Sequence, residues 1–156
     1  MQQNILRRCR MIKKVLFPTD FLEGSRKAAE VAVDIAKKYS AKLYIIHVIH
    51  DVLKSTGLYV PHVSAEELFK GLEEEAKKQI KKEYAEETRG MKDVHYEILR
   101  GVPYEEISKY AEKEGIDLIV IASHARKGLD RLFFGSTAEK VVKHAPCAVL
   151  TVRVKD

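Results

Sequence analysis

The sequence predicts a three-layer α/β fold, in which helices cover both faces of a parallel β-sheet. Short apolar runs alternate with longer amphipathic segments through the whole chain of 156 residues, and right-handed crossovers turn such an alternation into a parallel sheet. Several of the short runs are apolar without strict alternation, as in strands that are buried on both faces. The length and a hydrophobic fraction of 46% fit one domain with one substantial core.

Five short runs are predicted to form the strands of this sheet. They cover residues 14–18, 42–49, 94–99, 117–122 and 148–154. Helical segments lie between most of them and supply the crossovers that parallel pairing requires. The segment 51–63 carries Gly57 and Pro61 and shows little periodicity, which predicts a loop.

Four helices are predicted from apolar periodicity and from helix-start signals. The first covers 25–39, where apolar residues recur at spacings of three and four. The second begins at Ser64, because Ser64 and Glu67 have the spacing of a capping box. Pro103 suits the first turn of the third helix, and the fourth covers 136–144. One apolar stripe along the second helix consists of Leu68, Leu72, Ala76 and Ile80.

The charge distribution separates a basic start from a neutral body. Lys and Arg number 28 against 23 Asp and Glu, and five of the basic residues stand in the first fourteen positions, so the rest balances at 28 − 5 = 23 against 23. We therefore expect a flexible basic extension at 1–12 and a folded domain at 13–156. The sequence after the basic start contains no basic stripe of the kind that a nucleic-acid-binding surface requires.

Membrane, secretory and metal-binding classes are not favoured by the sequence. No run of eighteen apolar residues occurs, and the first thirty residues contain no signal-peptide core, so a cytoplasmic protein is expected. The six histidines and two cysteines show no ligand spacing of a zinc site, and neither cysteine is expected to form a disulfide.

The region between the fourth and fifth strands has the pattern of an anion-binding loop. The strand that ends at Ala122 is followed by Ser123-His124-Ala125-Arg126, and a loop then leads to Gly135-Ser136. A helix that begins at Ser136 directs its free N–H groups toward an anion. Ser136 and Glu139 also have capping-box spacing, which requires no ligand but is compatible with one.

These residues closely resemble the universal stress protein family. In its nucleotide-binding branch the loop reads Gly, two residues, Gly, nine residues and Gly-Ser or Gly-Thr, and this chain keeps the spacing through Ala122, Ala125, Gly135 and Ser136. The resemblance implies a Rossmann-like five-stranded sheet of order 3-2-1-4-5. The loop after the first strand, Pro18-Thr19-Asp20, then meets the loop after the fourth at the switch point, where open sheets bind ligands.

The resemblance also implies a ligand, ATP or a related adenine nucleotide, with Mg²⁺ or Mn²⁺ near its phosphates and little or no hydrolysis. Asp20 is expected to accept ribose hydroxyls or to hold the cation, and the backbone of Val48 to contact adenine. The alternatives are helix capping for Asp20 and core packing for Val48. The implied contact residues are Pro18, Thr19, Asp20, Val48, Ala122, Ser123, His124, Ala125, Arg126, Gly128, Gly135, Ser136 and Thr137.

Two alanines in place of glycine keep other functions open. Glycine at Ala122 and Ala125 would supply a positive φ or room for close approach. If the turn at Ala125 requires a left-handed backbone, alanine costs about 1 kcal/mol there, and if its methyl group instead occupies phosphate space, affinity is lost. A nucleotide-independent interaction module that acts through an unidentified protein partner is therefore the second hypothesis. The third is a slow ATPase in which Asp20 and His124 act on the nucleotide. The resemblance further implies a homodimer, paired through the strand 148–154.

Overall fold

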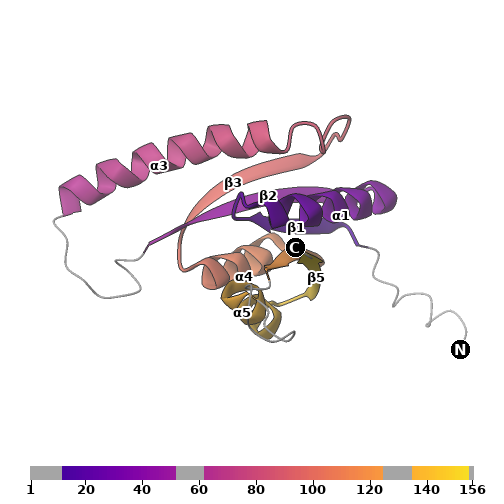
Figure 1. Cartoon of the computed structure of the whole chain (residues 1–156). Helices are drawn as coiled ribbons and strands as arrows, with labels where there is room; N and C mark the ends of the chain where they lie inside the picture. The colour runs from indigo at the N-terminus through magenta and orange to yellow at the C-terminus, as the bar shows by residue number, and fades with distance from the viewer. Residues whose placement is uncertain (1–11, 52–61, 125–134, 155–156) are drawn as a thin grey trace, which may run out of the picture.

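A computed structural model describes residues 12–51, 62–124 and 135–154 of the chain. Within these residues a five-stranded sheet of order β3-β2-β1-β4-β5 lies between layers of helices (Figure 1). The elements in chain order are β1 (Lys14–Thr19), α1 (Glu23–Tyr39), β2 (Lys42–His50), α3 (His62–Glu83), β3 (Val94–Gly101), α4 (Pro103–Glu114), β4 (Leu118–His124), α5 (Ser136–His144) and β5 (Ala148–Val154).

The parallel sheet confirms the predicted fold class and strand order. β1 lies at the centre and pairs in parallel with β2 and β4, and β3 and β5 add at the two sides. β1 pairs with β2 along its full length, from Lys14 to Thr19. Its pairing with β4 is recorded at Val15 and Leu16, near the amino end of both strands. The two strands that flank the switch point are thus paired near their amino ends, and their carboxyl ends extend beyond the paired residues.

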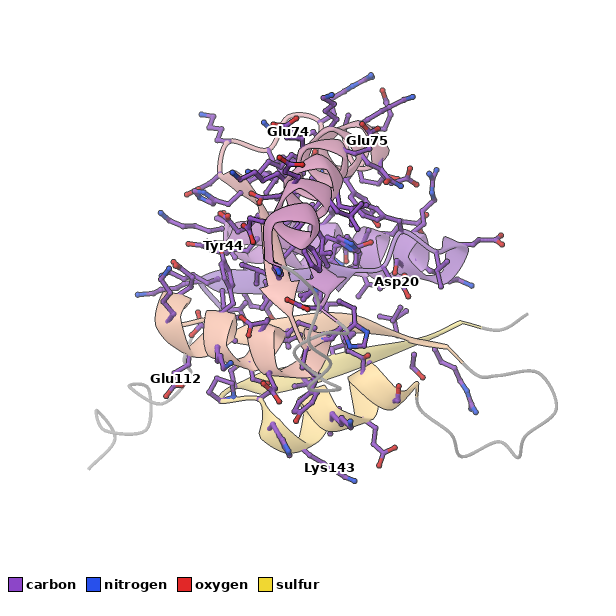
Figure 2. The ribbon with its side chains drawn as sticks, turned by 90° about the vertical axis from the view of Figure 1, so that its left-hand side faces the viewer. Asp20, Tyr44, Glu74, Glu75, Glu112 and Lys143 are labelled. Atoms are coloured by element: carbon purple, nitrogen blue, oxygen red, sulfur yellow. The ribbon has the colours of Figure 1, made fainter. Side chains whose placement is uncertain are left out.

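Side-chain alternation divides the core into two layers. Val15 and Phe17 point to the side covered by α1 and α3, and Leu16 points to the side covered by α4 and α5. Figure 2 shows the same division, with α1 and α3 above the sheet and α4 and α5 below it. Each large aliphatic side chain that is fully buried in these layers stabilises the fold by about 1.5–3 kcal/mol.

Several predicted element boundaries need correction. α1 begins at Glu23, not Ser25, because the Ser25 N–H already closes a turn on the carbonyl of Leu22 at 2.9 Å. α3 begins at His62, two residues before the predicted capping box at Ser64, since a terminal turn can extend past such a signal. β4 begins at Leu118, one residue later than predicted. Asp117 precedes the strand, and its carboxylate accepts the N–H groups of Lys13 and Lys14.

The predicted apolar stripe of α3 packs against the sheet along only half of its length. Ala76 and Ile80 are 7% and 1% exposed, whereas Leu68 and Leu72 are 63% and 45% exposed. Figure 1 shows the reason, because the amino-terminal end of α3 reaches past the end of the sheet. Helical periodicity thus identified the correct face, while the extent of the sheet determines how much of that face is buried.

Some expectations concern residues that the structure does not describe. The basic extension predicted at 1–12 falls almost entirely outside the described residues, as does most of the predicted loop at 51–63. The division of the chain at residue 13 therefore stays a prediction. None of the helices in the described part of the chain is both long and apolar enough to cross a membrane.

We predict that truncation of the α3 stripe has opposite consequences at its two ends. Ile80→Ala removes a side chain that is 1% exposed and is expected to lower the free energy of unfolding by about 2–5 kcal/mol. Leu68→Ala, a matched truncation in the same helix, is expected to change it by less than about 0.5 kcal/mol. Urea unfolding of both variants provides the measurement. Equal losses at the two positions would contradict the packing of α3 described above.

Candidate functional site

A cavity of about 310 Å³ lies at the carboxyl ends of β1 and β4, where the strand order reverses. The carboxyl ends of both strands, the end of β2 and the first turns of α1, α4 and α5 surround it. This is the position at which open parallel sheets bind ligands. The described residues that line it are Pro18, Thr19, Asp20, Leu22, Ser25, His47, Val48, Pro103, Ile107, Ile121, Ala122, Gly135, Ser136, Thr137 and Ala138.

Most of the described residues that the sequence nominated line this one cavity. They are Pro18, Thr19, Asp20, Val48, Ala122, Gly135, Ser136 and Thr137. Ser123 is buried near the end of β4 and is not among the lining residues. The side chain of His124 and the residues Ala125, Arg126 and Gly128 lie outside the described part of the structure.

Sequence reasoning missed several wall residues. His47 lies beside Thr19 in the parallel register of β1 and β2, so correct strand alignment would have placed it at the cavity. Ser25 lies in the first turn of α1, beside the aspartate that precedes the helix. Ile107 and Ile121 come from α4 and β4 and could be recognised only after the layers were assembled.

Asp20 organises the turn between β1 and α1. Its Oδ1 accepts the N–H of Leu22 at 3.0 Å and the Oγ–H of Ser25 at 2.5 Å. This is an Asx-type turn, in which a side-chain oxygen takes the place of a backbone carbonyl. In Figure 2, Asp20 lies between the upper layer that contains α1 and the lower layer that contains α5. The local structural role that the sequence offered as an alternative is therefore present, and the carboxylate still belongs to the cavity wall.

Phe21 holds a strained backbone conformation beside the cavity. Its φ is +62°, which a bulky residue rarely adopts. Its N–H donates to Thr19 Oγ1 at 3.0 Å, and its ring centroid lies 4.5 Å from that of His47. His47 Nδ1 lies 2.8 Å from the Thr19 carbonyl oxygen, and because a carbonyl can only accept, Nδ1 carries the proton. These contacts hold the turn in one geometry without a ligand.

The start of α5 faces the cavity without a side-chain cap. Gly135 is the N-cap residue, Ser136 is the first residue of the helix, and within the described residues no side chain caps this end. The predicted capping box of Ser136 and Glu139 is therefore wrong. Ser136 lies one position inside the helix, and Glu139 pairs with Lys143 at 2.7 Å instead. N–H groups in the first turn of a helix attract anions through their partial positive charge.

The backbone conformation at position 135 does not require glycine. Its φ of −54° and ψ of 142° are open to other residues. Ala122 has a related explanation, because it lies within β4 and pairs with Val152, so no left-handed conformation is required there. Ala122 is among the residues that line the cavity, and its side chain belongs to the core layer on the side of α1 and α3. Ala125 lies outside the described residues.

The cavity combines an apolar wall with a polar rim. Val48, Ile107 and Ile121 form apolar surface, whereas Asp20 and the first turn of α5 provide polar groups. No Lys or Arg occurs among the lining residues that the structure describes. Flat apolar rings suit the first surface, and anionic groups suit the helix start.

The described residues do not form a complete metal site. No group of three or more His, Cys, Asp or Glu side chains that could hold a metal ion occurs in the described ranges. Asp20 supplies one carboxylate to the cavity. Mg²⁺ characteristically uses one or two carboxylates together with substrate phosphates, which fits the limited donor set here.

We predict that the two roles of Asp20 can be separated. Asp20→Ala removes the acceptor of two hydrogen bonds and is expected to lower the free energy of unfolding by about 1–2 kcal/mol. Asp20→Asn keeps a carbonyl oxygen at the same position, so its free energy of unfolding is expected to fall by less than half as much. Chemical denaturation measures both variants. Equal stability of Asp20→Ala and the wild type would show that the Asx-type turn does not stabilise the fold.

Comparison with known proteins identifies the family. The model of the universal stress protein family matches residues 11–153. The universal stress protein MJ0531 of Methanocaldococcus jannaschii is 43% identical over 147 residues, which cover 92% of this chain and 83% of that protein. The solved structure of MJ0577, from the same organism, superposes with a TM-score of 0.78 at 33% identity and covers 94% of this chain and 99% of that one.

A more distant solved structure shares the fold. A universal stress protein in complex with cAMP has a TM-score of 0.60 and 22% identity, covering 93% of this chain and 99% of that chain. The family match spans almost the whole sequence, and the alignments cover 83% of MJ0531 and 98% of MJ0577. The five-stranded sheet and the loop spacing that suggested the resemblance agree with it. The chain belongs to the universal stress protein family.

Proposed function

We propose that the chain binds ATP or a related adenine nucleotide in the cavity between the carboxyl ends of β1 and β4. The observation that carries the proposal is the start of α5, which no side chain of the described residues caps and which opens on a cavity with an apolar wall on one side and Asp20 on another. A nucleotide presents the matching sequence of groups, namely an apolar ring, sugar hydroxyls and phosphates.

The cavity suggests one orientation for the nucleotide. The adenine ring lies against Val48, Ile107 and Ile121, and the ribose hydroxyls donate to Asp20. The phosphates lie at the first turn of α5, where Ser136 and Thr137 add hydroxyl donors to the backbone N–H groups. In the same orientation Ala122 is a residue of the cavity wall, and alanine continues β4 there without backbone strain.

Related structures support the ligand class. The universal stress protein solved with cAMP has the same fold and holds an adenine nucleotide. We propose that Mg²⁺ or Mn²⁺ enters together with the nucleotide, since Asp20 is one carboxylate and the phosphates supply the remaining oxygens. We assign no catalytic residue, and the proposed role is that of a stress-response or signalling protein in the cytoplasm, switched by nucleotide occupancy.

Replacement of Gly135 is expected to abolish the phosphate subsite. Gly135→Leu places a side chain at the N-cap of α5, where the backbone conformation accepts leucine but the phosphates need the space. We expect the affinity for ATP with Mg²⁺ to fall at least about tenfold, which corresponds to about 1.4 kcal/mol. Calorimetric titration provides the measurement.

Gly71→Leu is the matched control for this substitution. Gly71 lies in α3, and an added Cβ there meets no atom within 4 Å. Its affinity for ATP is expected to equal that of the wild type. Unchanged affinity in Gly135→Leu would exclude the proposed phosphate position. Absence of adenine-nucleotide binding by the wild type would instead favour the nucleotide-independent dimeric interaction module, which the alanines at positions 122 and 125 of the family motif favour.

We further propose a homodimer formed through β5. This strand lies at the side of the sheet, and Leu150 on it is 39% exposed. An open strand edge with an exposed apolar side chain favours pairing with a second copy.

Light scattering tests this arrangement. The wild type is expected to have the mass of a dimer, and Leu150→Glu is expected to be monomeric because a desolvated carboxylate opposes association. Leu68→Glu, at an exposed leucine on α3, is expected to leave the dimer intact. A monomeric wild type at micromolar concentration would contradict the proposal.

A further inference from the structure

A buried hydrogen bond connects the cavity wall to the core layer that lies between the sheet and helices α1 and α3. Tyr84 directly follows α3 and is 1% exposed. Its hydroxyl oxygen lies 2.5 Å from Thr19 Oγ1, although the two residues are 65 positions apart in the sequence. Thr19 lines the cavity, whereas Tyr84 belongs to the core layer beneath α1 and α3 and does not line it. Tyr84 therefore contacts a residue of the cavity wall without lining the cavity itself.

The ring and backbone of Tyr84 are fixed independently of this bond. The ring packs edge-on against Phe17, with centroids 5.3 Å apart and planes at 89°. The carbonyl of Tyr84 accepts the hydroxyl of Thr88 at 2.7 Å and its N–H at 3.1 Å. Because the Thr88 hydroxyl donates to that carbonyl, the hydroxyl of Tyr96, 2.9 Å away, donates to Thr88 Oγ1. The Tyr84 hydroxyl is thus presented to Thr19 by a rigid support.

Thr19 transmits this constraint to the turn that borders the cavity. Its Oγ1 accepts the N–H of Phe21, and its carbonyl accepts Nδ1–H of His47. The same Oγ1 atom thus contacts both the Tyr84 hydroxyl and the Phe21 N–H. Since Phe21 has a φ of +62°, the turn depends on contacts that compensate its strain. Burial raises the pKa of Tyr84 to about 12, so its hydroxyl keeps its proton at neutral pH.

We propose that Tyr84 is a positioning residue for the ligand cavity. Its hydroxyl orients Thr19 and thereby sets the turn from Thr19 to Leu22 against which the ligand binds. The effect on affinity rests on the proposed nucleotide function, whereas the effect on the turn does not. The same bond couples the end of α3 to occupancy of the cavity, because any coupling between two sites acts in both directions.

Tyr84→Phe tests the proposal, with Tyr96→Phe as its matched control. Both variants remove one hydroxyl from the same hydrogen-bonded chain, but only Tyr84 contacts Thr19. In Tyr84→Phe we expect the Kd for ATP to rise about three- to tenfold, the loss expected for one hydrogen bond. The Kd of Tyr96→Phe is expected to stay within about twofold of the wild type.

Amide hydrogen exchange gives a readout that needs no ligand. The N–H of Phe21 is expected to exchange about tenfold faster in Tyr84→Phe than in the wild type, and to be unchanged in Tyr96→Phe. If the wild type binds no ATP, the proposed function fails while the exchange of Phe21 still decides the positioning role. Unchanged exchange at Phe21 in Tyr84→Phe would overturn the inference.

A double-substitution cycle separates positioning from general loss of packing. Thr19→Val removes the same hydrogen bond from its other end, so its effect on Phe21 exchange is expected to overlap with that of Tyr84→Phe. The doubly substituted chain is then expected to exchange at the rate of the Thr19→Val chain. Fully additive effects would mean that Tyr84 acts through its packing on Phe17, and would also overturn the inference.

Discussion

The limited pairing of β1 with β4 is the constraint on which the rest of the site depends. The two strands are parallel neighbours, so the segments that follow them emerge at the same edge of the sheet. Their crossovers go to opposite layers, because α1 covers one side and α5 covers the other. The helices therefore diverge where the strands end, and the cavity occupies the space between them. Asp20 and Gly135 face this cavity because of topology, although more than a hundred residues separate them in the sequence.

The two walls of the cavity differ in how they are stabilised. The turn after β1 is tied down by Asp20, Thr19 and His47, which satisfy its backbone groups and hold Phe21 in a strained conformation. The start of α5 has no such side-chain cap among the described residues. One wall is thus preorganised by hydrogen bonds, and the other presents polar N–H groups that a ligand can satisfy. This difference favours an anionic group at α5 and a hydrogen-bond donor at Asp20.

The sequence was sufficient for the elements and for much of the cavity wall. Buried strands and amphipathic helices have distinct periodicities, so the strand segment Val15 to Phe17 and the helical residues Ala76 and Ile80 were assigned correctly to the core. Periodicity does not show where a sheet ends, which is why Leu68 and Leu72 were placed on the stripe but are exposed. The capping box at Ser136 failed because several residues near a helix start can serve as the N-cap, and Gly135 does so here.

Long-range contacts account for most of what the sequence could not supply. The bond between Thr19 and Tyr84 depends on how α3 packs over β1, and no local spacing encodes that geometry. The conformation of residue 122 is a second example, since the glycine of the family motif suggested a special backbone. The strand instead continues through this position, and alanine fits it without strain.

An amide NMR titration with ATP and Mg²⁺ tests the central claim most directly. The account predicts chemical-shift changes at Thr19, Asp20, Val48 and the segment 135–138. These residues come from β1 and the turn after it, from β2 and from the start of α5, and they meet at the cavity. Residues at the β3 edge of the sheet, such as Asp93 and His95, are expected to show no chemical-shift change. Shifts confined to the surface of α3 or to the edge of β3, or no shifts at millimolar ATP, would contradict nucleotide binding between β1 and β4.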